Sequence, residues 1–402
     1  MKKFGAKSTP KILFNALLYE KEGAGISVYT KKLIDAYLIN ETLDINCLVR
    51  KQFKEDYSEE DKVCLSTKPI YNSKQRILYE QIRGIKQYNQ YDLIHFPDYA
   101  IPLMSKAKKI ITIQDMAMFT MKEAYTRKQV LVKQFLLKCS LKRVDGIVCS
   151  SHYAKQELLR YFPYIKTNIE VIYPGVDEPK YKPLDEENKA SVLHKLNISK
   201  PYILFVGTLA PSKNILNLIK GFELIRKQGL DYQLVICGKK GWMYEDLFKV
   251  YQSSDYKKDI IFTDFIRQEE LETLYAEAKL FSSASLYEGF GFPPLEAMIR
   301  KVPVVVSDIE IFRETCEDAA LYYNPTDIED MARVLKQVLR NNDLQQHLIK
   351  EGYKRAKQFK TEETVKRLYA FYERVLNEDN YLYQEYNKIS LGSSNQGRDL
   401  SQ

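Results

Sequence analysis

Short runs of apolar residues alternate with longer amphipathic stretches along the first half of this 402-residue chain. The apolar runs have the length and the β-branched content of strands, and the stretches between them have helical spacing. Predicted strands cover residues 11–18, 43–49, 92–96, 109–113, 146–149 and 169–172, and predicted helices cover residues 26–39, 73–88, 126–143 and 151–161. Continuous apolar strands separated by helices indicate a parallel sheet that is covered on both faces.

The same alternation starts again after a charged, proline-containing segment between residues 173 and 199, which is typical of a linker and a surface helix. Predicted strands of the second half cover residues 202–206, 233–237, 260–262, 280–282 and 302–306, and predicted helices near 327–341, 343–358 and 361–386 follow. Two similar α/β halves joined by a linker imply a cleft between them. We expect ligands at the carboxyl ends of the strands, which is where parallel sheets bind them.

This organisation predicts an N-terminal Rossmann-like domain over residues 1–180, a C-terminal Rossmann-like domain over residues 181–375, and a helix end with a disordered tail over residues 376–402. No apolar run approaches the ~20 residues that a membrane-spanning helix needs, and the first residues do not form a signal peptide. We therefore expect a cytoplasmic protein, either soluble or bound at the inner face of the membrane.

Composition and charge bear on three features of the protein: disulfides, metal sites and contact with anionic surfaces. The six cysteines form no Cys-x-x-Cys pair, and several lie in apolar runs, so we expect small core residues in a reducing compartment. The four histidines are scattered and no Asp-x-Asp occurs, which argues against a metal site. Residues 101–160 hold 12 basic and 4 acidic residues. That balance suits contact with an anionic membrane or a phosphate-bearing lipid, or it is the solvated surface of a lysine-rich protein.

The segment SLYEGFGFPPLEAM, residues 285–298, follows a predicted strand and opens a predicted helix. Gly289 and Gly291 let the backbone approach a ligand closely, and the two prolines suit the first turn of a helix. The unpaired N–H groups and the dipole of such a helix attract an anion such as a phosphate. Glu288 in the loop and Glu296 on the helix add two carboxylates. This arrangement suits a nucleotide diphosphate sugar, although two glutamates at this spacing also occur in ordinary strand-turn-helix units.

The same segment, followed by VPVVVS at residues 302–307, resembles the Glu-x7-Glu element of glycosyltransferase family 4. The resemblance covers residues 10–375. It implies an α/β architecture of the GT-B type, in which two Rossmann-like domains face each other across a cleft. The acceptor is then expected in the first domain, the nucleotide-sugar donor in the second, and the C-terminal helix is expected to cross back to the first. The resemblance also implies a retaining reaction without a metal or other cofactor.

The resemblance assigns roles within the segment residue by residue. It makes Glu288 the catalytic residue, which orients the transferred sugar, and it places the ribose hydroxyls on Glu296. The donor is further expected to contact Gly289, Phe290, Gly291 and Phe292.

Two lysines are expected to meet the negative charge of the leaving diphosphate. Lys213 lies in GTLAPSKN, residues 207–214, which resembles the Lys-Asn phosphate-binding turn of the family. Relatives often carry an arginine where Ser212 or Thr208 stands here, so one cation is missing. Lys240, which follows the next predicted strand, could supply another.

The first half supplies the expected acceptor side. Gly25 closes a glycine turn after the first predicted strand, and we expect it to approach the donor. Asp98 ends the segment His95-Phe96-Pro97-Asp98, which resembles a family segment on the acceptor side; a histidine at a strand end is more often structural. Gln114 and Asp115 follow the next strand, where family members typically carry His-Asp. Glutamine can hydrogen-bond a hydroxyl or phosphate but cannot shuttle a proton.

Residues 126–144 combine apolar side chains with six Lys and Arg residues. This segment could lie on a membrane surface. The interpretation that we favour is a helix packed on the sheet with a basic outer face.

The sequence therefore predicts a retaining glycosyltransferase that moves a hexose from a nucleotide diphosphate sugar to a glycan or lipid-linked acceptor, in surface polysaccharide or oligosaccharide synthesis. Two alternatives remain open. A sugar-nucleotide epimerase or hydrolase with the same fold would turn over the donor without an acceptor. A non-catalytic partner subunit would keep the fold without turnover. Nucleic-acid binding is not expected, because no recognition module is present.

Overall fold

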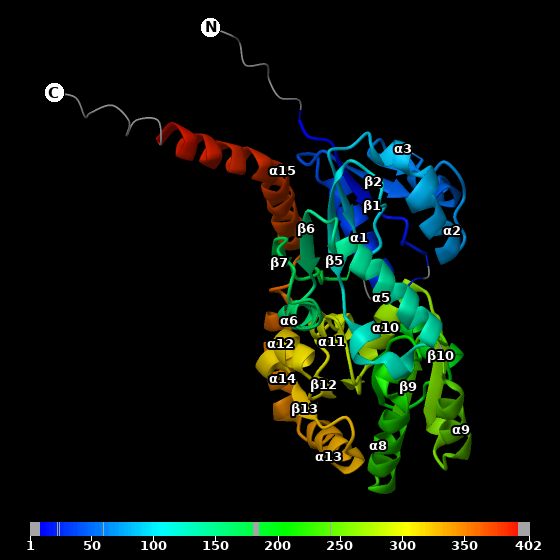
Figure 1. Cartoon of the computed structure of the whole chain (residues 1–402). Helices are drawn as coiled ribbons and strands as arrows, with labels where there is room; N and C mark the ends of the chain where they lie inside the picture. Colours follow the sequence, from blue (N-terminus) through cyan, green and yellow to red (C-terminus); the bar gives the residue numbers. More distant parts are fainter. Residues whose placement is uncertain are drawn as a thin grey trace, which may run out of the picture.

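The computed structural model describes residues 9–21, 23, 25–58, 60–179, 185–241 and 243–392, with side chains through Asn377. Of the tail predicted to be disordered, residues 393–402 lie outside the described residues. The chain folds into two α/β domains, each built on a parallel sheet with helices on both faces (Figure 1). The predicted fold class, two Rossmann-like domains across a cleft, is confirmed.

In the first sheet, the described strands run in the order β3-β2-β1-β4-β5-β6-β7, and every neighbouring pair is parallel. Ile12 in the central strand lies opposite Ile45 on one side and Leu93 on the other. The strands are β1 (Ile12–Asn15), β2 (Ile45–Val49), β3 (Val63–Leu65), β4 (Leu93–Phe96), β5 (Lys108–Ile113), β6 (Gly146–Cys149) and β7 (Ile169–Val171).

Helices cover both faces of this sheet because strands that carry apolar side chains on both faces must be buried on both. Side chains from α3, α5 and α6 pack on one face, and side chains from α1 pack on the other. The helices of this domain are α1 (Ile26–Ile39), α2 (Ser73–Leu78), α3 (Ile85–Tyr88), α4 (Ala117–Thr120), α5 (Arg127–Leu141) and α6 (His152–Tyr161).

The second sheet has the described strand order β10-β9-β8-β11-β12-β13, again parallel throughout. Its strands are β8 (Tyr202–Val206), β9 (Gln233–Cys237), β10 (Ile260–Asp264), β11 (Leu280–Ser283), β12 (Val304–Ser307) and β13 (Leu321–Tyr323). One face packs against α8, α9 and α13, and the other against α10, α11, α12 and α14. The helices are α7 (Glu186–Lys195), α8 (Ile215–Lys227), α9 (Glu245–Ser253), α10 (Gln268–Glu277), α11 (Phe292–Ile299), α12 (Glu310–Cys316), α13 (Ile328–Leu339) and α14 (Asn342–Ala356).

The last helix, α15 (Thr361–Gly392), returns from the second domain to the first (Figure 1). Its buried residues Leu368, Phe371 and Tyr372 pack with Phe14 of β1 and Tyr37 of α1. At its start, the backbone N–H of Thr361 donates to Asp177 at 3.0 Å, and that aspartate belongs to the segment that leads out of the first domain. The C-terminal helix therefore crosses back to the first domain, as the family resemblance implied, and it does so beside the segment that leads out of that domain.

No helix of the described residues is long and apolar enough to span a bilayer. The segment predicted as one helix over residues 73–88 is instead α2, a π-helical turn at Tyr79–Arg83, and α3. Such turns occur frequently at functional sites.

Candidate active site

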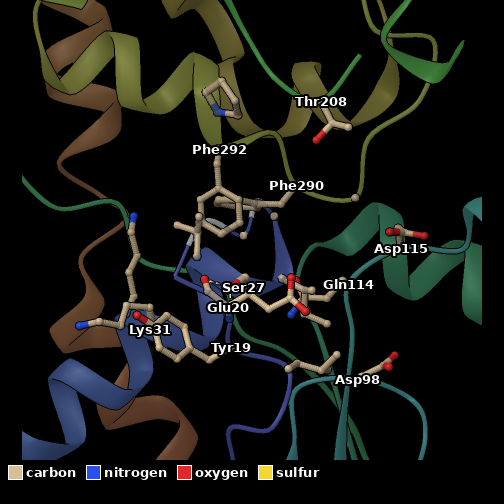
Figure 2. Close-up of a pocket in the computed structure, with 18 of the residues that line it drawn as sticks. Tyr19, Glu20, Ser27, Lys31, Asp98, Gln114, Asp115, Thr208, Phe290 and Phe292 are labelled. Carbon is tan, nitrogen blue, oxygen red and sulfur yellow. Dashed lines mark hydrogen bonds between the residues drawn. The ribbon is translucent and has the colours of Figure 1, made fainter. Parts of the chain in front are cut away.

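A cleft of about 2370 Å³ separates the two domains and is lined from both sides. The loops that follow β1, β4 and β5 form its first-domain wall, and those that follow β8, β9 and β11 form its second-domain wall. Figure 2 shows Asp98, Gln114 and Asp115 on the first side and Thr208, Phe290 and Phe292 on the other. All of the predicted site residues line this cleft, because the carboxyl ends of the strands in both sheets face it.

Lys213 and Glu288 form an ion pair inside the cleft, with 2.5 Å between Nζ and Oε1. Lys213 ends the turn Pro211–Lys213 after β8, and Glu288 lies in the loop after β11. The hydroxyl of Ser285 donates to the same Oε1 at 2.8 Å. A further backbone bond, from the N–H of Leu286 to the carbonyl of Ser212 at 2.8 Å, holds the two loops together. The lysine and the carboxylate are thus fixed as one unit.

Helix α11 begins at this loop, and Gly291 is its N-terminal cap with φ = 86°. A Cβ there would be strained by the backbone conformation and would approach the ring of Phe312 to 2.7 Å, so only glycine fits. The side chain of Phe290 is buried against Phe292 and Phe359, with ring centroids 5.1 and 5.7 Å away. The phenylalanine rings stabilise the turn, and a ligand at the helix N-terminus can meet the backbone N–H groups.

Glu296 lies one turn into α11, and its Oε2 accepts a hydrogen bond from the Tyr275 hydroxyl at 3.2 Å. Arg300, one turn further, donates to the Glu296 carbonyl at 2.9 Å and forms a two-pronged ion pair with Glu272 at 2.5 and 2.6 Å. The arginine also stacks over the Tyr275 ring, 4.9 Å from its centroid. No described residue donates a hydrogen bond to the other oxygen of the Glu296 carboxylate, which can therefore accept from ligand hydroxyls.

Gly289 is one of the points where the two domains touch. A Cβ at Gly289 would lie 2.0 Å from the carbonyl oxygen of Gln114 and 2.9 Å from Cβ of Asp115. The carbonyl of Gly289 accepts a hydrogen bond from the hydroxyl of Ser151 at 2.9 Å, and the Ser150 hydroxyl donates to the Gln114 carbonyl at 2.8 Å. We expected the backbone of Gly289 to approach a ligand closely; in this structure it closely approaches the other domain.

Gln114 and Asp115 face the Lys213–Glu288 pair across the cleft. Burial raises the pKa of the Asp115 carboxyl, and the nearby Glu288 carboxylate adds to the rise, whereas the Ala117 N–H, which donates at 2.9 Å, opposes it. Among the described residues, Nε2 of Gln114 has no hydrogen-bond partner although it is buried. An unpaired buried amide is costly, so this donor is suited to a substrate oxygen.

Asp98 is held by Arg76, whose Nη2 donates to Oδ2 at 3.3 Å. The same guanidinium donates to both oxygens of the fully buried Glu80, at 3.1 and 3.3 Å, and Glu80 also accepts from Asn15 at 3.0 Å. Burial raises the pKa of Glu80, and Arg76 opposes that rise. The network joins β1, α2, the π-helical turn and the loop after β4, and it sets the direction of the Asp98 carboxylate.

His95 has a structural position. Its Nδ1 lies 2.6 Å from the hydroxyl of Tyr372 on α15, and its Nε2 lies 2.7 Å from the hydroxyl of Thr112 on β5. Full burial lowers the pKa of His95 to about 3, so the ring is neutral near pH 7.

The remaining predicted residues line the cleft at its edges. Gly25 caps α1 with φ = 54°, and no atom lies within 4 Å of the position of a Cβ there. Lys240 lies beyond β9 with its ammonium 5.1 Å from the centroid of the Phe248 ring. Thr208 and Ser212, which replace the expected arginine, also line the cleft.

Sequence reasoning missed the residues that support these groups: Ser285, Tyr275, Arg300 and Arg76. Ser285 lies three residues before Glu288, and that proximity is the one local signal. The other three reach their partners through tertiary packing. In the described part of the chain, no group of three or more His, Cys, Asp or Glu residues could hold a metal ion.

Two family models match the chain, and each covers one domain. The model described as glycosyltransferase family 4 matches residues 52–179, and the model described as glycosyl transferases group 1 matches residues 187–355. The chain belongs to glycosyltransferase family 4. This glycosyltransferase is 28% identical over 302 residues to O-antigen chain mannosyltransferase B of Escherichia coli, and the match covers 74% of this chain and 78% of that relative. It is also 28% identical over 332 residues to the O-antigen chain mannosyltransferase RfbU of Salmonella typhimurium, with 79% and 88% covered.

Solved structures show the same fold for the glycosyltransferase. The Anabaena protein HepE, solved with UDP and glucose, superposes with a TM-score of 0.70 at 15% identity, over 91% of this chain and 100% of that chain. Sucrose-phosphate synthase from Thermosynechococcus elongatus superposes with a TM-score of 0.69 at 17% identity, over 95% and 100%. The expected GT-B fold is therefore confirmed.

Proposed function

We propose that this glycosyltransferase transfers a hexose, and specifically mannose, from a nucleotide diphosphate sugar to a glycan or lipid-linked acceptor in surface polysaccharide synthesis. The two relatives described above are both named as O-antigen mannosyltransferases, which supports the sugar and the pathway class. The arrangement that carries the proposal is the Lys213–Glu288 pair beside the N-terminus of α11, opposite Asp115.

The donor is placed on the second domain in this proposal. A diphosphate at the N-terminus of α11 would compete with Glu288 for the ammonium of Lys213, because phosphate carries more charge than one carboxylate. Glu288 would then turn to the hydroxyls of the sugar, while Ser285 still restrains it. Glu296, oriented by Tyr275, would accept hydrogen bonds from the ribose.

We also propose that the reaction needs no metal and retains the configuration of the sugar. Negative charge builds on the β-phosphate as the nucleoside diphosphate leaves. Lys213, Lys240 and the N–H groups at the start of α11 would stabilise this charge in place of a cation. Removal of one such preorganised group typically costs ~3–4 kcal/mol of transition-state stabilisation.

The acceptor is placed on the first domain, next to Gln114, Asp115 and Asp98. The Gln114 amide would donate a hydrogen bond to a sugar hydroxyl or a phosphate oxygen, since it lacks another partner in the described structure. Burial raises the pKa of Asp115, which makes its carboxylate a stronger proton acceptor than that of an exposed aspartate.

A thermal-shift panel of UDP, GDP, ADP, dTDP and their hexose conjugates, without added metal, tests the donor site. A ligand at 100 times its dissociation constant should add about 2.7 kcal/mol of stability. We expect one base to give a shift that Glu296→Ala loses and that Glu329→Ala, an exposed change on α13, keeps. If no nucleotide shifts the wild type, the chain is a non-catalytic partner. Rapid donor consumption without an acceptor would instead favour the hydrolase or epimerase.

A further inference from the structure

Helix α5 exposes apolar side chains on its outer face. Its residues Leu137 and Leu141 pack on the first sheet and Val130 is also buried, which confirms the predicted sheet-covering helix. On the outside, however, Leu131 is 68% exposed and Phe135 is 65% exposed. Two large apolar side chains one turn apart form a continuous strip rather than isolated surface residues. The outer face of α5 is therefore apolar as well as basic, whereas the prediction gave it a basic character alone.

Lysines extend this strip at both ends. Lys128, Leu131, Phe135, Lys138 and Lys142 follow each other at intervals of three or four residues, which places them along one side of the helix, and all are exposed. We name these five residues the α5 ridge. Residues 122–143 carry seven Lys or Arg and one acidic residue. Apolar side chains flanked by lysines are the pattern of a helix that lies in the interface of an anionic bilayer.

The surface beside the ridge continues this character. Arg143 donates to the carbonyl of Leu103 at 2.6 Å, which brings the loop of Met104 against the end of α5, and Met104 is 77% exposed. Gln81 donates to the carbonyl of Ile101 at 2.7 Å and so ties the π-helical turn to the same loop. Ile82 in that turn is 65% exposed. Exposed apolar groups therefore extend from α5 toward the π-helical turn.

The same helix borders the acceptor half of the cleft. Val132, Lys133 and Leu136 of α5 line the cleft one row away from the ridge, and Lys128 of the ridge lines it as well. α5 extends from the first domain toward the second across the opening between them (Figure 1). A bilayer in contact with the ridge would thus lie next to the acceptor side.

We propose that the α5 ridge docks on an anionic lipid bilayer and that the acceptor glycan reaches the cleft while it is still attached to a lipid. The acceptor part rests on the proposed transferase function; the docking part does not. In the part of the chain that the structure describes, the lysines of the ridge form no ion pair, and such basic charge favours an anionic lipid surface over a protein surface of mixed charge.

Flotation of the full chain with vesicles tests the docking. Vesicles contain either zwitterionic phospholipid alone or a mixture with anionic phospholipid. The wild type should bind the anionic vesicles, and the double changes Leu131→Ser/Phe135→Ser and Lys138→Glu/Lys142→Glu should each weaken binding by about tenfold or more. Matched controls should bind as the wild type does: Ile39→Ser, an exposed apolar residue on α1, and Lys227→Glu/Lys350→Glu on the second domain.

Several results would overturn the docking. The first is that the wild type fails to bind anionic vesicles, and the second is that the ridge variants bind as well as the wild type does. The third is that the wild type forms a dimer that dissociates when the ridge is changed, since a second copy of the chain would then cover the ridge. Transfer to a water-soluble acceptor should be unchanged in both ridge variants. Because flotation needs no donor, absence of transfer in the wild type would refute the proposed function without affecting the docking result.

Discussion

Replacement of Gly289 by alanine tests whether the contact between the domains sets the geometry of the cleft. The new Cβ would lie 2.0 Å from the carbonyl oxygen of Gln114, whereas such contacts in proteins are essentially never under 3.0 Å. The loop that carries Glu288 must therefore move away from the first domain by about 1 Å or more. A misplacement of that size between donor and acceptor groups can lower kcat by about 100-fold.

Donor binding should survive this change, because Lys213, Glu296 and α11 all belong to the second domain. We expect Gly289→Ala to lower kcat by about 100-fold while nucleotide affinity, measured by calorimetry, stays within a few-fold of the wild type. The matched control is Gly229→Ala, at φ = 82° with no atom within 4 Å of the Cβ. That change costs about 1 kcal/mol of backbone strain but should leave turnover unchanged. Wild-type turnover by Gly289→Ala would refute the reasoning.

Three further predictions concern stability and are measured by denaturant unfolding. Arg76→Met should lower the unfolding free energy by about 3–5 kcal/mol because it leaves the Glu80 carboxylate buried and unpaired, and Arg76→Met/Glu80→Gln should recover part of the loss; no recovery would contradict the ion-pair account. Glu314→Ala should cost about 1 kcal/mol, since its carboxylate accepts from the N–H groups of His152 and Tyr153 at 2.7 and 2.8 Å and so caps α6 from the other domain; an unchanged midpoint would show that the cap is not used. His95 takes up a proton near pH 6.5 in the unfolded chain but only near pH 3 in the folded chain. The free energy of unfolding should therefore fall by up to about 1.4 kcal/mol for each pH unit between pH 6.5 and pH 3. His95→Gln should make this decrease with falling pH less steep.

The alternation of strands and helices was predictable because buried parallel strands are continuous apolar runs. The two strands that the sequence did not reveal, Val63–Leu65 and Leu321–Tyr323, have three residues each and lie at sheet edges, where partial exposure weakens the apolar pattern. The π-helical turn at Tyr79–Arg83 also has no periodic signal, since its sequence fits an ordinary amphipathic helix.

The candidate site was predictable where one short segment carries its groups, as with Glu288 and Glu296. The parts that depend on long-range packing were not. Arg300 reaches Glu272 from 28 positions away in the chain, and Glu314 reaches α6 from 162 positions away. Phe290 illustrates a different limit: it lines the cleft, but the sequence did not reveal that its side chain packs in the core beneath the turn.

Transfer itself gives the most direct test of the central claim. Nucleotide diphosphate hexoses are incubated with a lipid-linked or soluble glycan acceptor and a metal chelator, and the anomeric configuration of the product is read by NMR. We predict transfer with retained configuration by the wild type, and rates lower by about tenfold or more in Lys213→Ala and Glu288→Ala, with both variants folded as judged by circular dichroism. Transfer by both variants at the wild-type rate would contradict the assignment of the site, and an inverted product would contradict the proposed mechanism.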